Sequence, residues 1–481
     1  MKLIYELSQA GRRGTRLPEC SVSRAKAKIP ATLRRTTEPE LPEVSELDVI
    51  RHYTCLSRLN FSVDTHFYPL GSCTMKYNPK MCEMLSRMDG FSRLHPLLPQ
   101  LRHGGMLTQG ALRVLFDTER MLSEVTGMAE STLQPMAGAN GELTGVMIMA
   151  AYHQKRGNEK RRILVPDSAH GTNPATAAIA GYSVTTIPSD GQGCMDLDAF
   201  RKELAADVAG VMLTSPNTLG LFERNVTAIC DLVHGVDGLA YCDGANMNAF
   251  VGRVRAADLG FDIVHLNLHK TFATPHGGGG PGAGGIGVVA KLQQFLPVSR
   301  VVKRDDGTFA LNYNYPDSIG YIGPFYGNFG VILRAYAYLR ALGAEGLREA
   351  SDTAVLNANY VRVMLRDAFD FPYDGLCMHE CVCSATRHEK QGIHALDIAK
   401  ALLDRGFHAP TMYFPLIVKE ALMIEPTETE SKETLDAFVA ALLEIAAVAG
   451  SAPEKVKEAP ETTPVGRLDE VAAARDMILR A

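Results

Sequence analysis

A lysine at the end of an apolar run is the residue best suited to covalent chemistry in this sequence. The segment HLNLHKTF (265–272) places His269 and Lys270 after apolar residues that predict a buried strand, and PHGGGGPGAGG (275–285) follows. Ligands bind at the carboxyl ends of strands in open α/β sheets, and a lysine there suits Schiff-base chemistry. A surface lysine beside a flexible loop would explain the same residues, and the order of lysine and glycines differs from that of a nucleotide P-loop.

A carboxylate follows a second predicted strand. LAYCDGANMNAF (239–250) places Asp243 at the end of an apolar run, and its distance from Lys270 leaves room for one crossover between neighbouring strand ends. A carboxylate facing a pyridine nitrogen keeps that nitrogen protonated. An aspartate of this kind, combined with a lysine Schiff base, is the recurring arrangement of pyridoxal phosphate (PLP) sites. An aspartate that caps the next helix is the alternative.

A run of small residues predicts a place for a phosphate. PMAGANGELTG (135–145) leads directly into a helix predicted over 145–157, with Asn140, Gly141 and Glu142 at the turn. Unbonded backbone N–H groups and the positive end of the helix dipole attract phosphate. An ordinary helix N-terminus has the same composition and is the alternative.

A histidine after another strand completes the set. In DSAHGTNPA (167–175), His170 could lie over an aromatic cofactor ring and Thr172 could offer its hydroxyl to the polar edge of that ring. A lone loop histidine is usually solvated or packed. All four features fall at a predicted strand end or helix start, and together they supply a phosphate site, a ring stack, a partner for the ring nitrogen and a reactive amine.

Alternating strands and helices position these residues. The predicted strands are ILV (163–165), SVTTIP (183–188), VAGVMLT (208–214), GLAYC (238–242), DIVHLNL (262–268) and IGVVA (286–290). Alternation of this kind implies a mostly parallel sheet that is buried on both faces.

The remaining chain divides by composition. We expect an N-terminal arm at 1–104, a large α/β domain at 105–335, a smaller α/β domain at 336–450 and a charged tail with one short helix at 451–481. In the smaller domain, TETESKE before an apolar periodic run predicts a helix start.

Composition excludes several classes of protein. The 481 residues carry 49 Lys and Arg against 54 Asp and Glu, a formal charge of −5, which excludes a globally basic nucleic-acid binder. No apolar run approaches the ~18 residues of a membrane span, and the N-terminal apolar stretch is too short for a signal peptide. Ten cysteines are too few for a disulfide scaffold, so we expect reduced thiols and a cytoplasmic enzyme.

Several motifs together resemble one known family. They are PLGSCTMKYNP (69–79), HGTNPA (170–175), PNTLGLFE (216–223), CDGAN (242–246), HLNLHKTF with PHGGGGPG, YGNFG (326–330), FHAPTMYFP (407–415) and MIEPTETE (423–430). From about 50 to 475 the chain resembles the PLP-bearing half of glycine dehydrogenase (decarboxylating), the P-protein of the glycine cleavage system. The resemblance implies the aspartate-aminotransferase-like fold of PLP enzymes, fold type I, and a length matching the second subunit of a split P-protein.

The resemblance also implies roles for individual residues. Lys270 would hold PLP as a Schiff base, Asp243 would pair with the pyridine nitrogen, and Ala245 and His170 would contact opposite faces of the ring. The implied phosphate contacts come from the turn Ala139, Asn140 and Gly141, helped by His269. Asn140 departs from the His or Gln that the family would favour. The loop with Ser72, Cys73, Thr74 and Lys76 would lie near the active-site entrance.

The implied reaction is decarboxylation of glycine with transfer of the aminomethyl group to the lipoyl arm of the H-protein. A homologous P-protein subunit 1 is the implied partner, in an α₂β₂ heterotetramer; no nucleic acid and no membrane is expected. Another fold-type-I PLP enzyme, such as an amino-acid decarboxylase or aminotransferase, would share the four site features. A non-catalytic scaffold subunit is a further alternative.

A metal site is a further alternative, and we expect none. The segment CMHECVCSATRH concentrates potential zinc ligands, namely Cys377, His379, Glu380, Cys381, Cys383 and His388. Such a site needs tetrahedral convergence, and CVC on one strand sends both thiols to the same face. Buried cysteines of a second domain are the favoured interpretation.

Overall fold

The computed structural model describes residues 2–478 except 17, 20, 22–29, 38, 96–97, 99–103 and 276–281. The chain forms two compact units, residues 1–62 and 63–481. The first unit contains η1 (Ile4–Leu7), η2 (Ala31–Leu33) and α1 (Glu46–Ser57). At the start of α1, Ser45 and Asp48 each accept a hydrogen bond from the other's backbone N–H, a capping box. The domain bounds expected from composition stay a prediction.

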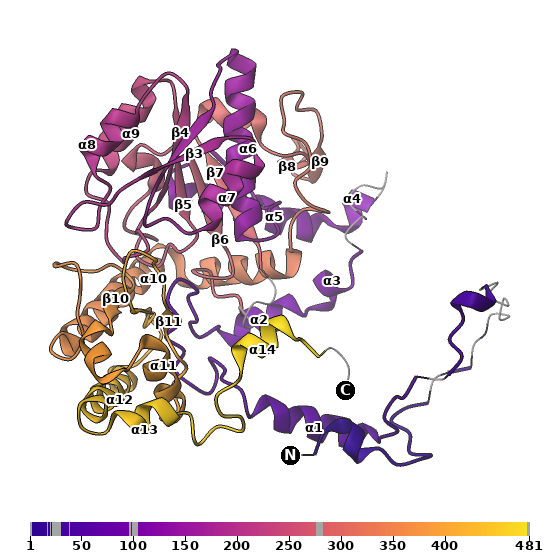
Figure 1. The fold of residues 1–481 in the computed structure, drawn as a ribbon. Coiled ribbons are helices and arrows are strands. Elements are labelled where there is room, and N and C mark those ends of the chain that lie inside the picture. Colours follow the sequence, from indigo (N-terminus) through magenta and orange to yellow (C-terminus); the bar gives the residue numbers. More distant parts are fainter. Residues whose placement is uncertain are drawn as a thin grey trace. The chain divides into compact units, whose positions relative to one another are not determined.

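A seven-stranded sheet forms the centre of the larger unit (Figure 1). Its strands, in spatial order, are β1 (Glu130–Thr132), β7 (Gly284–Val288), β6 (Ile263–Asn267), β5 (Leu239–Gly244), β4 (Val208–Thr214), β2 (Arg162–Pro166) and β3 (Ser183–Ile187). The run from β6 to β3 is parallel, and β7 is antiparallel to both of its neighbours. The prediction of a mostly parallel sheet is therefore confirmed.

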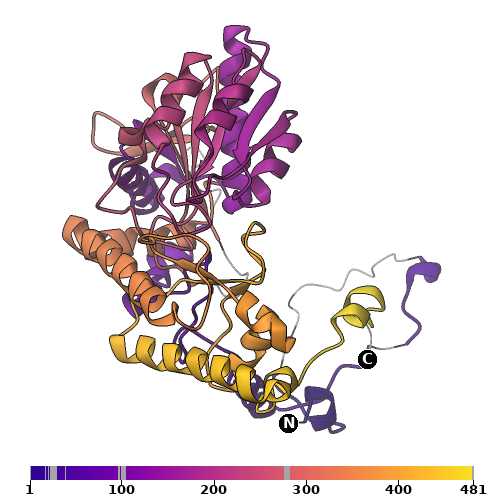
Figure 2. The same ribbon diagram turned by 60° about the vertical axis from the view of Figure 1, so that its left-hand side comes forward.

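Helices cover both faces of this sheet (Figure 2). One face packs against α6 (Gly138–Arg156) and α7 (Thr172–Ile179), and the other against α5 (Gln109–Thr126), α8 (Leu197–Glu203) and α9 (Val226–Gly235). Along β5, Leu239 and Tyr241 join the first core, whereas Ala240 and Cys242 join the second. This alternation with a period of two is why the central strands are apolar throughout.

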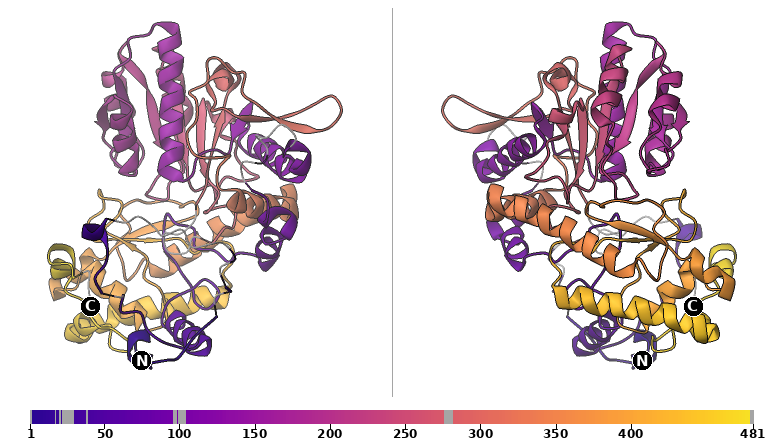
Figure 3. Two further views of the ribbon diagram at one scale, coloured as in Figure 1. Left: turned by 90° about the vertical axis from the view of Figure 1, so that its right-hand side faces the viewer. Right: turned by 90° about the vertical axis from the view of Figure 1, so that its left-hand side faces the viewer.

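A smaller antiparallel sheet builds the second core. Its order is β10 (Cys381–Ser384), β12 (Ala421–Ile424) and β11 (Thr411–Met412), and the helices α11 (Ala395–Leu403) and α12 (Lys432–Ser451) pack with it. The long helix α10 (Phe329–Leu365) joins both cores and breaks at Gly343, whose φ is +60°. Figure 3 shows α10 between the large sheet and α12.

Short elements complete the larger unit. They are α2 (Lys80–Ser86), α3 (Asp89–Ser92), α4 (Gly104–Leu107), η4 (Ala256–Leu259), η5 (Ala290–Phe295), the hairpin β8 (Arg300–Lys303) and β9 (Phe309–Asn312), η6 (Thr386–Gln391), α13 (Pro453–Glu458) and α14 (Glu470–Arg475). The tail therefore holds two helices rather than the single one predicted. Pro453 starts α13, because a proline lacks only an N–H group that the first helical turn would leave unbonded.

The helix α12 begins where the sequence predicts, since the Ser431 hydroxyl accepts a hydrogen bond from Thr434 N–H. By length and composition, α12 could also cross a membrane, contrary to the expectation that no segment is apolar enough. Leu435, Phe438 and Leu442 are buried in the small-sheet core. Packing in that core explains the apolar composition of α12.

The packing of α6 on the sheet gives a testable prediction. A Cβ added to Gly145 would lie 2.5 Å from the Tyr241 ring, which is fully buried and cannot move aside. Gly145→Ala should therefore lower the free energy of unfolding by about 1–3 kcal/mol. Gly110→Ala is the matched control, because the nearest atom to its added Cβ is 3.8 Å away. It should be neutral or stabilise α5 by up to about 1 kcal/mol. Urea unfolding would compare the two, and equal effects would contradict the close packing.

Candidate active site

A cavity of about 260 Å³ lies at the carboxyl ends of β4, β5 and β6. The predicted site residues that line it together are Ala139, His170, Thr172, Asp243, Ala245, His269 and Lys270. Ser72, Cys73, His379 and Glu380 line the same cavity from more distant parts of the sequence. Residues 276–281, which hold most of the glycine-rich run, lie outside the described residues.

Asp243 is fixed by three donors. Its Oδ1 accepts from Ala245 N–H at 3.0 Å and lies 3.2 Å from His265 Nδ1, and its Oδ2 accepts from Asn173 Nδ2 at 3.0 Å. The parallel register of β5 and β6 places Asp243 directly opposite His265. Oδ2 accepts only the Asn173 bond and has a second lone pair, so a ring nitrogen could still donate to this group.

The surroundings of His265, which lies behind Asp243, favour its charged form. Its Nδ1 faces the carboxylate, and its Nε2 lies 2.9 Å from Asn267 Oδ1, so both ring nitrogens face acceptors. Burial alone would lower the pKa of His265, but the hydrogen bond and charge of Asp243 outweigh it and raise that pKa. Burial likewise opposes ionisation of Asp243, yet His265, the Ala245 N–H and the charge of Lys270 hold the pKa of Asp243 below its usual value.

Lys270 lies three residues beyond β6 and lines the cavity with Asp243. Its backbone N–H donates to the Asn267 carbonyl, which fixes the turn after the strand. Within the described residues, its side-chain amine has no hydrogen bond or ion pair. An amine aimed into a cavity without a fixed partner is available for covalent chemistry.

The start of α6 borders the same cavity. Gly141 N–H already donates to the Ala137 carbonyl, whereas the N–H groups of Gly138, Ala139 and Asn140 bond to no described residue. Asn140 turns its Oδ1 back to accept from Met136 N–H at 2.9 Å. The helix therefore offers backbone donors to an anion, while the Asn140 side chain is engaged elsewhere and does not line the cavity.

Gly141 and Thr172 act through their neighbours. A Cβ on Gly141 would lie 2.6 Å from the His265 ring, so glycine lets α6 approach β6, although Gly141 itself does not line the cavity. Thr172 donates its hydroxyl to Glu142 Oε1 at 2.7 Å, and His170 Nδ1 lies 2.7 Å from the same hydroxyl. Burial and the charge of Asp243 raise the pKa of Glu142, and its Oε2 is buried without a described partner.

Sequence reasoning missed the residues that support the site. His265 stands in the quoted motif HLNLHKTF, but only the strand register shows that it faces Asp243. Glu380 and Glu425 are carboxylates within apolar or cysteine-rich runs. Because charged residues are seldom buried without a partner, their position in such runs could have indicated a buried site.

The ligands of the alternative zinc site are dispersed. Cys381 and Cys383 face the small-sheet core, and His388 Nε2 donates to the Ala368 carbonyl at 3.1 Å. His379 and Glu380 instead lie with Glu425 at the cavity. The structure thus separates the cysteines from the histidines that the sequence places next to them.

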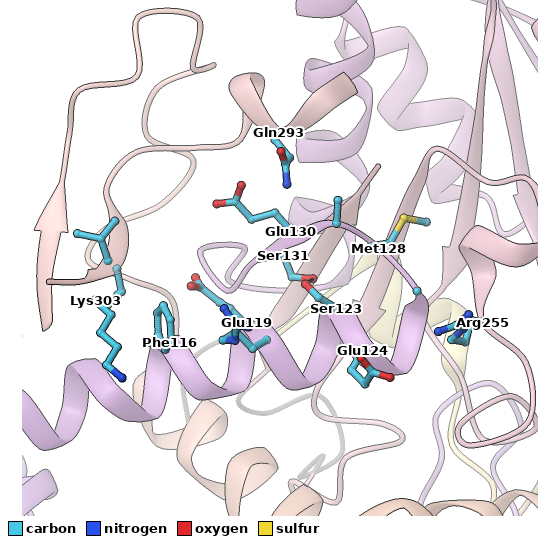
Figure 4. A pocket seen from close by; sticks show the side chains of 15 residues that line it. Phe116, Glu119, Ser123, Glu124, Met128, Glu130, Ser131, Arg255, Gln293 and Lys303 are labelled. Carbon is cyan, nitrogen blue, oxygen red and sulfur yellow. Dashed lines mark hydrogen bonds between the residues drawn. The ribbon is translucent and has the colours of Figure 1, made fainter. Parts of the chain in front are cut away.

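A larger cavity, of about 760 Å³, lies between α5, β1 and the β8–β9 hairpin. Figure 4 shows the side chains of Glu119 and Glu130 extending into this space from α5 and β1. Burial and the charge of Glu130 raise the pKa of Glu119 well above its usual value. None of the predicted site residues lines this cavity, so we assign the chemistry to the smaller one.

Comparison with solved structures identifies the class of fold. A glycine decarboxylase (P-protein) of the glycine cleavage system, in inhibitor-bound form, superimposes with a TM-score of 0.70 at 22% identity, covering 88% of this chain and 93% of that one. A cysteine desulfurase from Thermococcus onnurineus superimposes with a TM-score of 0.62 at 15% identity, covering 80% and 95%. The fold is the PLP-dependent transferase fold, fold type I.

Sequence comparison then identifies the family. The model of the glycine cleavage system P-protein matches residues 23–310, and that of the glycine dehydrogenase C-terminal domain matches 350–462. Proteins named probable glycine dehydrogenase (decarboxylating) subunit 2 from Listeria innocua and Caldanaerobacter subterraneus are 53% and 54% identical over 483 and 481 residues. The alignments cover 100% and 99% of this chain and 98% of each relative. The chain belongs to the glycine cleavage system P-protein family.

The buried pair of Asp243 and His265 predicts how the free energy of unfolding depends on pH. Because the pKa of His265 is raised by folding, its contribution to stability is complete below its unfolded pKa of about 6.5 and is lost as pH rises through the folded value. His265→Gln should lower the free energy of unfolding by about 3–5 kcal/mol near pH 6, and by less at higher pH.

His394→Gln is the matched control, because His394 faces Glu420 at 3.1 Å but is half exposed. It should cost at most about 1 kcal/mol. Urea titrations at a series of pH values would measure both variants. A difference for His265→Gln that grows with pH would contradict a charged His265.

Proposed function

We propose that this chain is the PLP-bearing subunit of a P-protein, which decarboxylates glycine and passes the aminomethyl group to the lipoyl arm of the H-protein. The observation that carries the proposal is Lys270 and Asp243 at one cavity, in a chain of the P-protein family. A homologous subunit 1 is the proposed partner, since the relatives are named subunit 2. The α₂β₂ assembly and the cytoplasmic location remain predictions from the sequence.

The residues at the cavity fit PLP. An aldehyde needs an amine without a fixed partner, which Lys270 supplies. A pyridine nitrogen needs a carboxylate that stays ionised, and Asp243 is kept so by His265. A phosphate needs backbone donors at a helix start, which Gly138 and Ala139 offer. These three requirements are met around one cavity.

Each of these residues has a distinct task in the proposed reaction. PLP, when bound, acts as an electron sink for the bond that breaks at the glycine α-carbon. Asp243 keeps the proton on the ring nitrogen, and His265 keeps Asp243 ionised. His170 and Ala245, which both line the cavity, are proposed to confine the ring between them. Thr172, held by Glu142, is proposed to fix the polar edge of the ring.

The alternatives differ in substrate and in activity. Another fold-type-I enzyme would keep Lys270 and Asp243 but would prefer a different amino acid, so a panel of amino acids separates it from a glycine decarboxylase. A scaffold subunit would not need the buried pair of Asp243 and His265 at the cavity that Lys270 lines. The retained Lys270, Asp243 and His170 favour catalysis.

Lys270→Ala tests the proposal directly. The variant should lose both the yellow absorbance of lysine-bound PLP and glycine–bicarbonate exchange, because no other group at the cavity is expected to hold the aldehyde. Lys202→Ala, at the exposed end of α8, should leave both unchanged. Exchange at a near-normal rate in Lys270→Ala would overturn the assignment.

Asp243→Asn tests the ring-nitrogen partner. The amide has no negative charge to hold the ring proton, so we expect a loss of about 3 kcal/mol in transition-state stabilisation, or roughly a hundredfold in exchange rate. The yellow colour should persist, because Lys270 is intact. Unfolding measurements and the absorbance spectrum would show that the variant is folded and binds PLP; unchanged exchange would exclude the proposed role of Asp243.

A further inference from the structure

Three buried side chains of the small-sheet region lie at the cavity, and two of them line it. His379, Glu380 and Glu425 are 2%, 3% and 0% exposed, and one ring nitrogen or carboxylate oxygen from each lies within 4.8 Å of the others. His379 and Glu380 line the cavity itself, and Glu425 lies behind them, directly after β12. Two buried carboxylates this close repel each other when both are ionised, and the free energy of that state is high. One of the two carboxyl groups therefore keeps its proton.

The hydrogen bonds decide which carboxyl holds the proton. Glu425 accepts from Thr74 N–H and Oγ1–H at 3.1 and 2.9 Å and from Asn246 Nδ2 at 2.9 Å. Glu380 accepts one hydrogen bond, from Ser72 N–H at 2.9 Å. Donors stabilise an anion, so the charge belongs on Glu425 and the proton on Glu380. Burial first, and then the charge of Glu425, raise the pKa of Glu380.

His379 adds a polar ring that has no hydrogen-bond partner among the described residues. Both of its ring nitrogens are buried and have no hydrogen bond with any described residue. Burial and the charge of Lys270 lower the pKa of His379 to about 3, so the ring is neutral and can donate one hydrogen bond and accept another. Its Nε2 lies 3.8 Å from Glu380 Oε2, too far for a hydrogen bond. A buried polar ring in this state indicates a bound group in the cavity.

The proposed reaction requires a proton at one defined atom. As carbon dioxide leaves, the electron pair of the broken C–C bond forms a new bond between the aminomethyl carbon and one sulfur of the lipoyl disulfide. The S–S bond breaks and its electron pair goes to the second sulfur, which must gain a proton. Glycine enters as an ammonium ion that loses one proton, so the reaction balances if a group in the site carries that proton between the two.

We propose that Glu380 is this proton carrier: its O–H bond breaks as the S–H bond forms on the leaving sulfur, and its carboxylate then takes a proton from the ammonium of the next glycine. The proposal rests on the function proposed above and deepens it. Glu425 is a positioning residue, since it holds the charge that keeps Glu380 neutral. His379 orients the group that enters between Glu380 and Lys270.

The backbone places Glu380 at the cavity. Gly220 has a φ of +76°, and a Cβ there would lie 2.1 Å from the Glu380 carbonyl oxygen, so only glycine permits this approach. Met378 N–H donates to the Gly220 carbonyl at 2.7 Å and ties the two segments together. The titratable and charged groups that act on Glu380 or lie against it are Glu425, His379, Lys270, Cys73, Cys377 and Cys381.

The test uses Glu380→Gln in the full chain with PLP, subunit 1 and lipoylated H-protein. Transfer to the disulfide should fall about a hundredfold, whereas glycine–bicarbonate exchange without a disulfide, in which no sulfur gains a proton, should fall by a much smaller factor. The wild-type transfer rate should fall as pH rises through the raised pKa of Glu380, and the variant should lose this dependence. Glu380→Asp, which retains an acid, should keep the dependence at a lower rate.

An independent readout avoids activity altogether. The infrared difference spectrum between the wild type and Glu380→Gln at neutral pH should contain the carbonyl stretch of one protonated carboxylic acid, while the contributions of Glu119 and Glu142 cancel in the difference. Glu444→Gln is the control for an exposed glutamate and should change neither the spectrum nor the rates.

The outcomes separate the two proposals. If the wild-type chain has no yellow colour and no exchange, the proposed function fails whatever Glu380 does. If the wild type is active and Glu380→Gln keeps both its transfer rate and its pH dependence, the proton carrier is overturned. Equal losses of exchange and transfer in Glu380→Gln would show a structural role instead and would overturn it as well.

Discussion

The ion pair between Asp243 and His265 is the constraint around which the large sheet and its helices are arranged. Both side chains are almost wholly buried, and an isolated charge there would cost several kcal/mol. Each is stabilised only because the parallel register of β5 and β6 sets it against the other. Asn173 and Asn267 complete the pair, since each gives one of the two charged groups a further neutral hydrogen-bond partner.

The same pair determines how closely α6 must pack. Gly141 lies against the His265 ring and Gly145 against the Tyr241 ring, and larger residues would push the helix away from the sheet. Because the helix is close, its unbonded N–H groups reach the cavity at which Asp243 and Lys270 lie. The packing of α6 against β5 and β6 thus brings its unbonded N–H groups to the cavity that Asp243 and Lys270 also line.

The sequence predicted those parts of the molecule that depend on local patterns. Apolar runs located the central strands, with β4 matching at both ends, and the strand ends pointed to Asp243 and Lys270. The helix α6 begins at Gly138, seven residues before the predicted start at 145, because glycines favour helix poorly and only packing against the sheet makes them helical. His265 required the register of two strands, and Glu380 and Glu425 required the docking of a separate sheet, neither of which a local pattern contains.

The loop of Ser72, Cys73 and Thr74 links this second sheet to the cavity. Ser72 and Thr74 have φ values of +67° and +51°, a left-handed conformation that is costly for residues with side chains. Their backbone N–H groups donate to Glu380 and Glu425 respectively, so two buried carboxyls hold the strained loop. Glu380 can keep one oxygen on Ser72 and its proton on the other, because a carboxylic acid both accepts and donates. The loop that carries Cys73 into the cavity is therefore held from both sides by buried carboxyl groups, and the bond from Ser72 N–H is compatible with both the acid and the carboxylate form of Glu380.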